Sequence, residues 1–173
     1  MFFLAEFPVI PLTNSSAVRV NTVSVSAFKE DGGGSVGSVG ISATVFALSD
    51  PHLALATSGK SMDCFGPEWV DHPTKMAAAW DEQVDAEDLV LVPGDISWSK
   101  NIEGAMAYLE WIAARPGTKI LCKGNHEMWW PSKAKVRGVL PEGMFALEAD
   151  AVRVGEVGVC ATRLWDVPGV SYH

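Results

Sequence analysis

The sequence has few cysteines and no paired cysteine motif. Its three cysteines are Cys64, Cys122 and Cys160, and no two of them are spaced as Cys-x-x-Cys. A structural zinc site built from thiolates is therefore not expected. Two of the cysteines lie within apolar runs, where a free thiol packs as a small hydrophobic side chain. We expect buried thiols in a reducing compartment, and hence a cytoplasmic protein.

The sequence also lacks a run of about 18 apolar residues, the length that a membrane-spanning helix needs. Its amino-terminal stretch, MFFLAEFPVIPL, includes Glu6, Pro8 and Pro11 but no basic residue. A secretory signal begins with a basic segment and continues with an uninterrupted apolar one. The stretch is therefore not predicted to be a secretory signal, and we expect no membrane partner.

Positive charge is scarce. The 13 Lys and Arg residues are outnumbered by 21 Asp and Glu residues, which gives a formal net charge of −8. A surface that binds duplex nucleic acid or an anionic membrane needs a surplus of Lys and Arg to neutralise phosphates. We therefore expect neither partner, whereas an acidic chain suits a cation site.

The composition is typical of a globular protein with one domain. The chain has 173 residues and is 48% hydrophobic, which is ample for a packed core. Residues 17–28 alternate as a strand does, but the Gly/Ser-rich run at 31–40 cannot hold one backbone conformation at low entropic cost. We interpret residues 1–40 as a flexible or non-native leader and residues 41–173 as the domain.

The glycine-rich run contains a match to a dinucleotide-binding motif. Gly32, Gly34 and Gly37 fit the pattern G-x-G-x-x-G. In a dinucleotide site these glycines open a helix whose amides receive the pyrophosphate, whereas the residues that follow here are β-branched and strand-like. A dinucleotide-binding module stays open as a distant alternative.

Apolar runs and helical patterns alternate from residue 43 onward, which predicts an α/β fold. Each apolar run is short and apolar on both faces, as are strands of a parallel sheet that is buried on both sides. Segments with apolar residues at helical spacing lie between them. The predicted strands are 43–50, 88–95 and 118–125, the predicted helices are 74–88 and 101–117, and a hairpin with a Gly155-Glu156 turn is predicted at 151–161.

Each predicted strand ends in a polar residue that can bind a metal ion. Asp50 ends the first strand, Asp95 the second and Asn125 the third, and His52 follows shortly after Asp50. In open α/β sheets ligands bind at the carboxyl edge of the strands, so these side chains are expected to converge. Imidazole, carboxylate and amide ligands suit Mn, Fe, Zn or a similar divalent ion.

Three sequence blocks that contain these residues resemble signature motifs of a known family. The blocks DPH (50–52), GDISW (94–98) and GNHE (124–127) are similar to the first three motifs of the calcineurin-like metallophosphoesterase superfamily. The resemblance covers the chain from about residue 43 to its end. It implies an α/β sandwich of two β-sheets flanked by helices, with a di-metal centre at the strand ends.

The resemblance also implies a role for each residue of that centre. Asp50 and His52 would hold the first ion, Asp95 would bridge both ions, and Asn125 would hold the second. Two divalent ions would activate a shared water for in-line attack on phosphorus and neutralise the developing charge. His126 would donate a proton to the leaving oxygen. The implied function is hydrolysis of a phosphomonoester or phosphodiester, with a small molecule or nucleotide as substrate.

Two departures from the superfamily pattern limit this expectation. Phosphoprotein phosphatases continue the second motif as Gly-Asp-x-x-Asp-Arg-Gly, whereas this chain continues through Ile96, Ser97 and Trp98, so that branch is not expected. The later histidine motifs are also missing, because only His72, which we interpret as a loop residue, and the terminal His173 remain. We expect a member that is incomplete at its C-terminus, with a truncated second sheet and little activity of its own. A non-catalytic fragment or relic of such an enzyme stays open as an alternative.

The remaining candidates have competing interpretations. Arg163 can meet a substrate phosphate with its fork of donors, or form a surface ion pair. We expect Trp98, Trp129 and Trp130 to act as large packing units beside the site. Glu127 is either an acceptor that orients a ligand or a solvated loop carboxylate.

Overall fold

The computed structural model describes residues 2–3, 17–26, 40–55, 61–154 and 157–163. The strands are β1 (Phe2–Phe3), β2 (Ala17–Ser26), β3 (Gly40–Leu48), β4 (Leu89–Val92), β5 (Thr118–Cys122), β6 (Met144–Leu147), β7 (Asp150–Val154) and β8 (Val157–Ala161). The helices are α1 (His72–Gln83), α2 (Ile102–Ala113) and α3 (Lys133–Arg137), with short 3-10 helices η1 (Met62–Phe65) and η2 (Pro67–Trp69).

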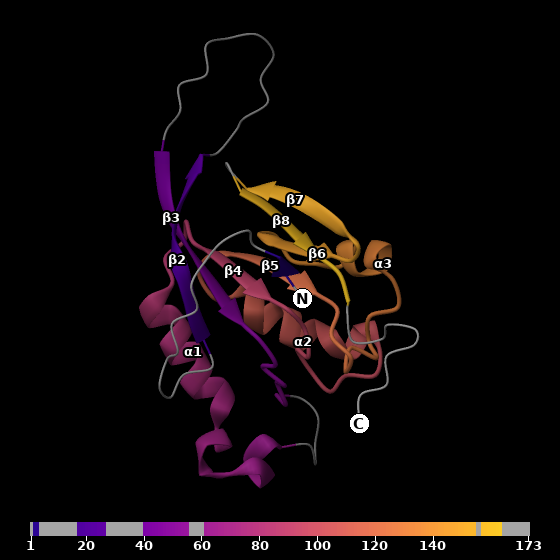
Figure 1. The fold of residues 1–173 in the computed structure, drawn as a ribbon. Coiled ribbons are helices and arrows are strands. Elements are labelled where there is room, and N and C mark those ends of the chain that lie inside the picture. The colour runs from indigo at the N-terminus through magenta and orange to yellow at the C-terminus, as the bar shows by residue number, and fades with distance from the viewer. Residues whose placement is uncertain (1, 4–16, 27–39, 56–60, 155–156, 164–173) are drawn as a thin grey trace, which may run out of the picture.

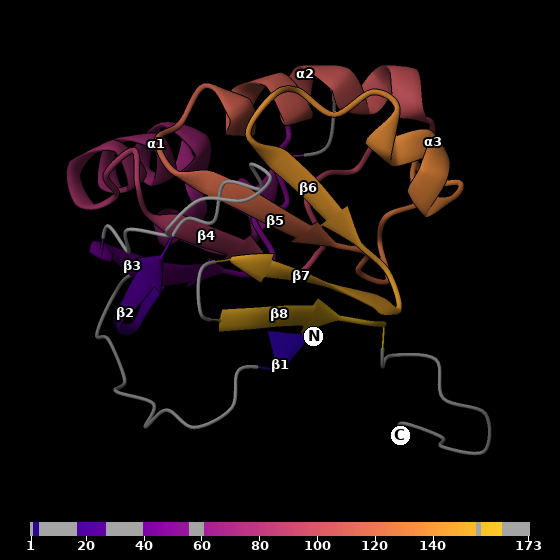
Figure 2. The same ribbon diagram turned by 90° about the horizontal axis from the view of Figure 1, so that it is seen from above.

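The strands form two sheets that pack as layers of a sandwich. The larger sheet has the order β2-β3-β4-β5-β6 and the smaller has the order β1-β8-β7 (Figure 1). Figure 2 shows the helices on one face of the larger sheet and the smaller sheet on its other face. The fold is therefore α/β, as the sequence pattern predicted, and it is the sandwich that the family resemblance implied.

The larger sheet is parallel from β3 to β6, and β2 pairs with its edge in the antiparallel direction. The three strands predicted from the apolar runs are confirmed as neighbours in this sheet. Strand β6 and helix α3 were not predicted, because both are short. β6 has only four residues, of which Phe145 is exposed, and α3 has only five. The hairpin β7-β8 is also confirmed, although its turn at 155–156 lies outside the described residues.

Both faces of the parallel strands are buried, in different layers of the core. Successive side chains of a strand point to opposite faces. Val45 and Leu89 pack toward the smaller sheet with Val159, whereas Phe46 and Val90 pack toward the helices. This explains why the strands are apolar on both faces in the sequence.

Helix α1 begins earlier and ends earlier than its sequence pattern predicted. His72 is its first residue and is buried, so the interpretation of His72 as a loop residue was wrong. The helix ends at Gln83 because the following segment turns around a buried carboxylate. Asp88 accepts the backbone N–H of Asp85 at 2.9 Å and, across the sheet, that of Thr44 at 2.7 Å.

The first forty residues contribute two strands to the described structure. β2 pairs with β3 along its length, and β1 pairs with β8. The glycines at positions 32, 34 and 37 lie outside the described residues. The predicted boundary between a leader and the domain at residue 40 is not tested by these pairings and stays a prediction.

The cysteines differ in their burial. Cys122 is buried in β5, but Cys64 and Cys160 are exposed, so the expectation of buried thiols was wrong for these two. Cys160 lies within an apolar run, but it belongs to a two-faced strand and points to the exposed side. Among the helices that the structure describes, none is long and apolar enough to cross a membrane.

Candidate metal centre

Three predicted metal ligands converge at the carboxyl ends of β3 and β4. Asp50, His52 and Asp95 each offer one donor atom, and these atoms all lie within 4.8 Å of one another. Nε2 of His52 is 3.9 Å from Oδ1 of Asp50 and 3.9 Å from Oδ2 of Asp95. Because β3 and β4 are parallel neighbours, their ends deliver these side chains to the same edge of the sheet.

The backbone is left-handed at all three of these residues. The φ angles are 53° at Asp50, 40° at His52 and 55° at Asp95. Non-glycine residues rarely adopt positive φ, and strain of this kind is concentrated at functional sites. Only five non-glycine residues in the described part of the chain have positive φ, so three of the five belong to this cluster. The left-handed turns redirect each side chain toward the edge of the sheet.

Backbone hydrogen bonds hold the two loops beside each other beyond the ends of the strands. The donors come from the loop after β3 and the acceptors from the loop after β4: Asp50 N to Gly94 O at 3.2 Å, His52 N to Asp95 O at 2.9 Å and Leu53 N to Ile96 O at 2.8 Å. The pairing that begins in the sheet is thus continued through the candidate ligands.

The side chain of His72, at the start of α1, contacts the loop after β3. Nε2 of His72 lies 3.0 Å from the carbonyl oxygen of Pro51, the residue between the two candidate ligands of that loop. The ring of Trp69 contacts the His72 ring edge-on, with centroids 5.4 Å apart. His72 is therefore a structural tether for the loop, which its position before a proline did not indicate.

A buried carboxylate joins the loops after β4 and β5. Only 2% of Glu127 is exposed, and its carboxylate accepts the backbone N–H groups of Asp95 at 2.8 Å, of Gly124 at 2.6 Å and of Ile96. Burial raises the pKa of Glu127 to about 7, against the three N–H donors, which favour the charged form. Of the two interpretations of Glu127, a buried acceptor that orients the Asp95 loop is the one that the structure shows.

The same two loops approach each other through glycines. A Cβ atom added to Gly94 would lie 2.4 Å from the backbone nitrogen of Gly124. A Cβ atom added to Gly124 would lie 2.3 Å from Oδ1 of Asp95. Oδ1 of Asp95 also accepts the backbone N–H of His126 at 2.9 Å. The glycines are therefore required by the close packing of the two loops around Asp95.

Three aromatic rings meet beside the carboxylates. The His52 ring stacks on the indole of Trp98, with centroids 4.9 Å apart and planes at 18°. His126 contacts both, at 5.2 Å from Trp98 and 5.7 Å from His52. Trp129 and Trp130 are core residues, each 1% exposed, so their predicted packing role is confirmed.

The donor atoms of the cluster fit a divalent ion. Burial lowers the pKa of His52 below its usual 6.5, and the nearby carboxylates of Asp95 and Asp50 do not fully offset this effect. The ring is therefore neutral near pH 7, and a neutral imidazole has one nitrogen whose lone pair can bind a metal ion. One imidazole nitrogen and two carboxylate oxygens suit Mn, Fe or Zn.

The remaining predicted site residues are Asn125, His126 and Arg163. Asn125 is exposed in the loop after β5, beside His126, whose ring is half-buried against His52 and Trp98. Arg163 is exposed beyond β8, in the chain that leaves the smaller sheet. The roles of all three in metal or substrate binding stay predictions.

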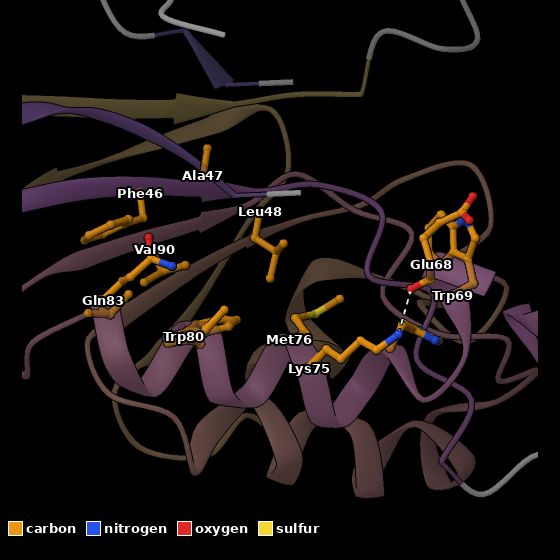
Figure 3. Close-up of a pocket in the computed structure, with 13 residues that line it drawn as sticks. Phe46, Ala47, Leu48, Glu68, Trp69, Lys75, Met76, Trp80, Gln83 and Val90 are labelled. Carbon is orange, nitrogen blue, oxygen red and sulfur yellow. Dashed lines mark hydrogen bonds between the residues drawn. The ribbon is translucent and has the colours of Figure 1, made fainter. Parts of the chain in front are cut away.

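A cavity of about 680 Å³ lies between α1 and β3, away from the candidate ligands. Its walls are mainly apolar and include Phe46, Leu48, Met76 and Trp80, as Figure 3 shows. Lys75 and Glu68 lie at one end, where the Lys75 ammonium donates to the Glu68 carbonyl oxygen at 3.3 Å. None of the candidate metal ligands lines this cavity, so it is distinct from the metal centre.

Comparisons with known proteins point to one family. A family described as calcineurin-like phosphoesterase matches residues 43–170. The Gene 66 protein of Mycobacterium phage D29 is 41% identical over 83 residues, which cover 48% of this chain and 40% of that protein. The Gene 66 protein of Mycobacterium phage L5 is 44% identical over 57 residues, which cover 33% of this chain and 27% of that protein. The matched parts thus span less than half of each phage protein.

Among solved structures, a protein of unknown function from Aquifex aeolicus is similar. The similarity has a TM-score of 0.45 at 19% identity and covers 73% of this chain and 63% of that one.

Proposed function

Because the chain belongs to the calcineurin-like phosphoesterase family, we propose that it is a metal-dependent hydrolase of phosphomonoesters or phosphodiesters. The observation that carries the proposal is the convergence of Asp50, His52 and Asp95 within 4.8 Å, on loops with left-handed backbone. In this proposal Asp50 and His52 would hold one ion, Asn125 would hold a second, and Asp95 would contribute to both. Manganese is our first choice of ion, and iron or zinc would suit the same donors.

Bound divalent ions would supply an activated water and neutralise charge on the phosphoryl oxygens. The contribution of the chain is to hold its donors in place before an ion arrives. Glu127 fixes the backbone of Asp95, and Asp95 in turn fixes the backbone of His126. The His126 ring lies beside the cluster, 5.7 Å from the His52 ring, and in this proposal it donates a proton to the leaving oxygen.

The proposed substrate is a small-molecule or nucleotide phosphoester. The two carboxylates of the cluster, Asp50 and Asp95, and a net charge of −8 oppose the approach of a polyanion such as duplex nucleic acid. Arg163 is kept as a proposed phosphate contact.

A non-catalytic protein with the same scaffold is the second candidate. It is favoured by the small number of donors that we propose for a second ion, which are Asp95 and Asn125. The two candidates differ in stoichiometry: an active centre binds two ions per chain, whereas a relic binds one or none.

The deciding experiment combines metal counting with turnover. The metal-stripped chain is titrated with Mn²⁺ by calorimetry, and hydrolysis of bis(4-nitrophenyl) phosphate and 4-nitrophenyl phosphate is followed at each Mn²⁺ concentration. Turnover that appears with the second equivalent of Mn²⁺ and is lost with a chelator supports the enzyme. Binding of one ion without turnover supports the non-catalytic candidate.

A further inference from the structure

Trp98 lies where the three loops of the candidate metal centre meet. It belongs to the loop after β4, three residues beyond Asp95. Its indole is stacked on His52, from the loop after β3, and is also 5.2 Å from the ring of His126, from the loop after β5. Trp98 is half-buried, unlike the fully buried Trp129 and Trp130. The expectation that it acts only as a packing unit does not account for these contacts with two site residues.

Within the described part of the chain, no hydrogen bond from Nδ1 orients the His52 ring. Histidine ligands of metal ions usually donate their second ring nitrogen to a carboxylate, carbonyl or water, which fixes the plane of the ring. Nδ1 of His52 is buried, and within the described part of the chain it has no hydrogen-bond partner. Nε2 nevertheless points toward Asp50 and Asp95, at 3.9 Å from each.

The His52 ring is stacked on the indole of Trp98, with centroids 4.9 Å apart. The two planes are inclined by only 18°, so the indole covers one face of the imidazole. Rotation of the imidazole about its bond to Cβ would break the stack and drive one edge of the ring into the indole. The same rotation would move Nε2 away from the two carboxylates.

We propose that Trp98 is a positioning residue that holds the His52 imidazole in the plane required for a metal ligand. The stack with Trp98 replaces the hydrogen bond from Nδ1 that usually fixes the ring plane of a histidine ligand. The inference rests on the proposed metal-dependent function, because it concerns the readiness of His52 to bind a divalent ion. Through its contact with His126, the same indole also limits the positions of the proposed proton donor.

The test uses the full chain and two substitutions that separate stacking from filling of space. Trp98→Phe keeps a flat ring against His52, whereas Trp98→Leu fills part of the space without stacking. Trp111→Leu is the matched control, because Trp111 is half-buried on α2 and its ring contacts Arg115 rather than the site. Mn²⁺ affinity is measured by calorimetry, and thermal unfolding of each metal-free variant is measured in parallel.

We expect Trp98→Leu to bind Mn²⁺ about 3- to 10-fold more weakly, the range that corresponds to the loss of one aromatic pair. Trp98→Phe and Trp111→Leu are expected to stay within about twofold of the wild type, since stacking is retained in the first and untouched in the second. Proton NMR gives a readout that is independent of metal. The ring protons of His52 are expected to be shifted upfield by the indole, and this shift disappears in Trp98→Leu.

Equal Mn²⁺ affinity of Trp98→Leu and wild type would overturn the inference while leaving the proposed function intact. A loss of affinity in Trp98→Phe as large as in Trp98→Leu would also overturn it, because stacking would then not be the cause. Unchanged affinity with slower hydrolysis of aromatic phosphoesters would assign Trp98 to substrate contact instead. If the wild type shows the NMR shift but binds no Mn²⁺, the proposed function fails while the stack itself stands.

Discussion

The carboxylate of Glu127 accepts the backbone N–H of Asp95 at 2.8 Å, although the two residues belong to loops that follow different strands. One oxygen of Glu127 serves Asp95 and Gly124, and the other serves Ile96. The loop that carries Asn125 and His126 is thereby fixed to the loop that carries Asp95. The position of Asp95 relative to the loop after β5 therefore depends on this buried side chain.

Glu127→Gln should destabilise the protein by about 1–3 kcal/mol. The amide replaces one carboxylate oxygen with an NH₂ group, which leaves at least one buried backbone N–H facing a donor. Urea unfolding of the metal-free chain measures the loss. Glu87→Gln, at an exposed position of the turn before β4, is the control and should be neutral. Equal midpoints for Glu127→Gln and wild type would show that the three hydrogen bonds do not hold the loops.

Asp95→Asn should weaken Mn²⁺ binding more than about 100-fold, beyond the effect typical of changes around the ligands. The amide oxygen can still accept the His126 N–H, so the fold should be retained, but the negative charge that faces His52 is lost. Calorimetry and circular dichroism test the two parts. Asp85→Asn, at an exposed position after α1, is the control. Unchanged Mn²⁺ binding and unchanged turnover would remove Asp95 from the metal centre.

His126→Ala should lower the rate of hydrolysis most for substrates whose leaving group must be protonated. Alkyl phosphoesters should lose about 100-fold or more in rate, whereas nitrophenyl esters, which have stable leaving groups, should lose much less. Steady-state hydrolysis of both classes at saturating Mn²⁺ makes the comparison. Equal losses on the two classes would point to a binding role for His126.

Gly124→Ala should destabilise the protein by about 1–3 kcal/mol, because the packed loops have no room for another methyl group. The new Cβ would lie 2.3 Å from Oδ1 and 2.6 Å from the backbone nitrogen of Asp95. Gly158→Ala is the control, since a Cβ atom there would meet nothing within 4 Å. Thermal unfolding of both variants tests the difference. Similar melting temperatures for the two would contradict the close approach of the loops.

Asp150 should contribute stability that is lost in acid. Partial burial pushes its pKa upward, but the hydrogen bonds from Lys133, Glu148 N–H and Arg137 outweigh burial and hold the pKa below its usual 3.8. A carboxyl group whose pKa is depressed by folding stabilises the protein above the unfolded pKa, and this stability is lost as the pH falls through the folded pKa. We therefore expect wild type to exceed Asp150→Asn in stability at pH 5 to 7.

The advantage of wild type over Asp150→Asn should shrink below about pH 3.8, the unfolded pKa. Urea midpoints at several pH values from 7 down to about 2.5 measure it. Asp63→Asn, at an exposed position of η1, is the matched control for the substitution itself. A difference between wild type and Asp150→Asn that is constant with pH would mean that the ion pairs with α3 do not depress this pKa.

The sequence by itself determined the parallel strands and the order of the residues at their ends. Apolar runs on both faces, helical spacing between them and polar residues at each strand end are local properties of the chain. They sufficed to predict that Asp50, His52 and Asp95 would meet, because parallel strands deliver their ends to one edge. Strand β6 was missed because four residues with one exposed phenylalanine carry too little pattern.

Only the tertiary structure decided how those residues are held. Glu127 reaches Asp95 across 32 positions of the chain, and His72 reaches Pro51 across 21, so neither contact leaves a periodic signal in the sequence. The same is true of the stack between His52 and Trp98, which come from loops after different strands. The exposure of Cys160 was also decided at this level, because an apolar run does not show which face of a strand the core covers. Local sequence sets the elements and their ends, whereas packing between distant segments sets the directions in which side chains point.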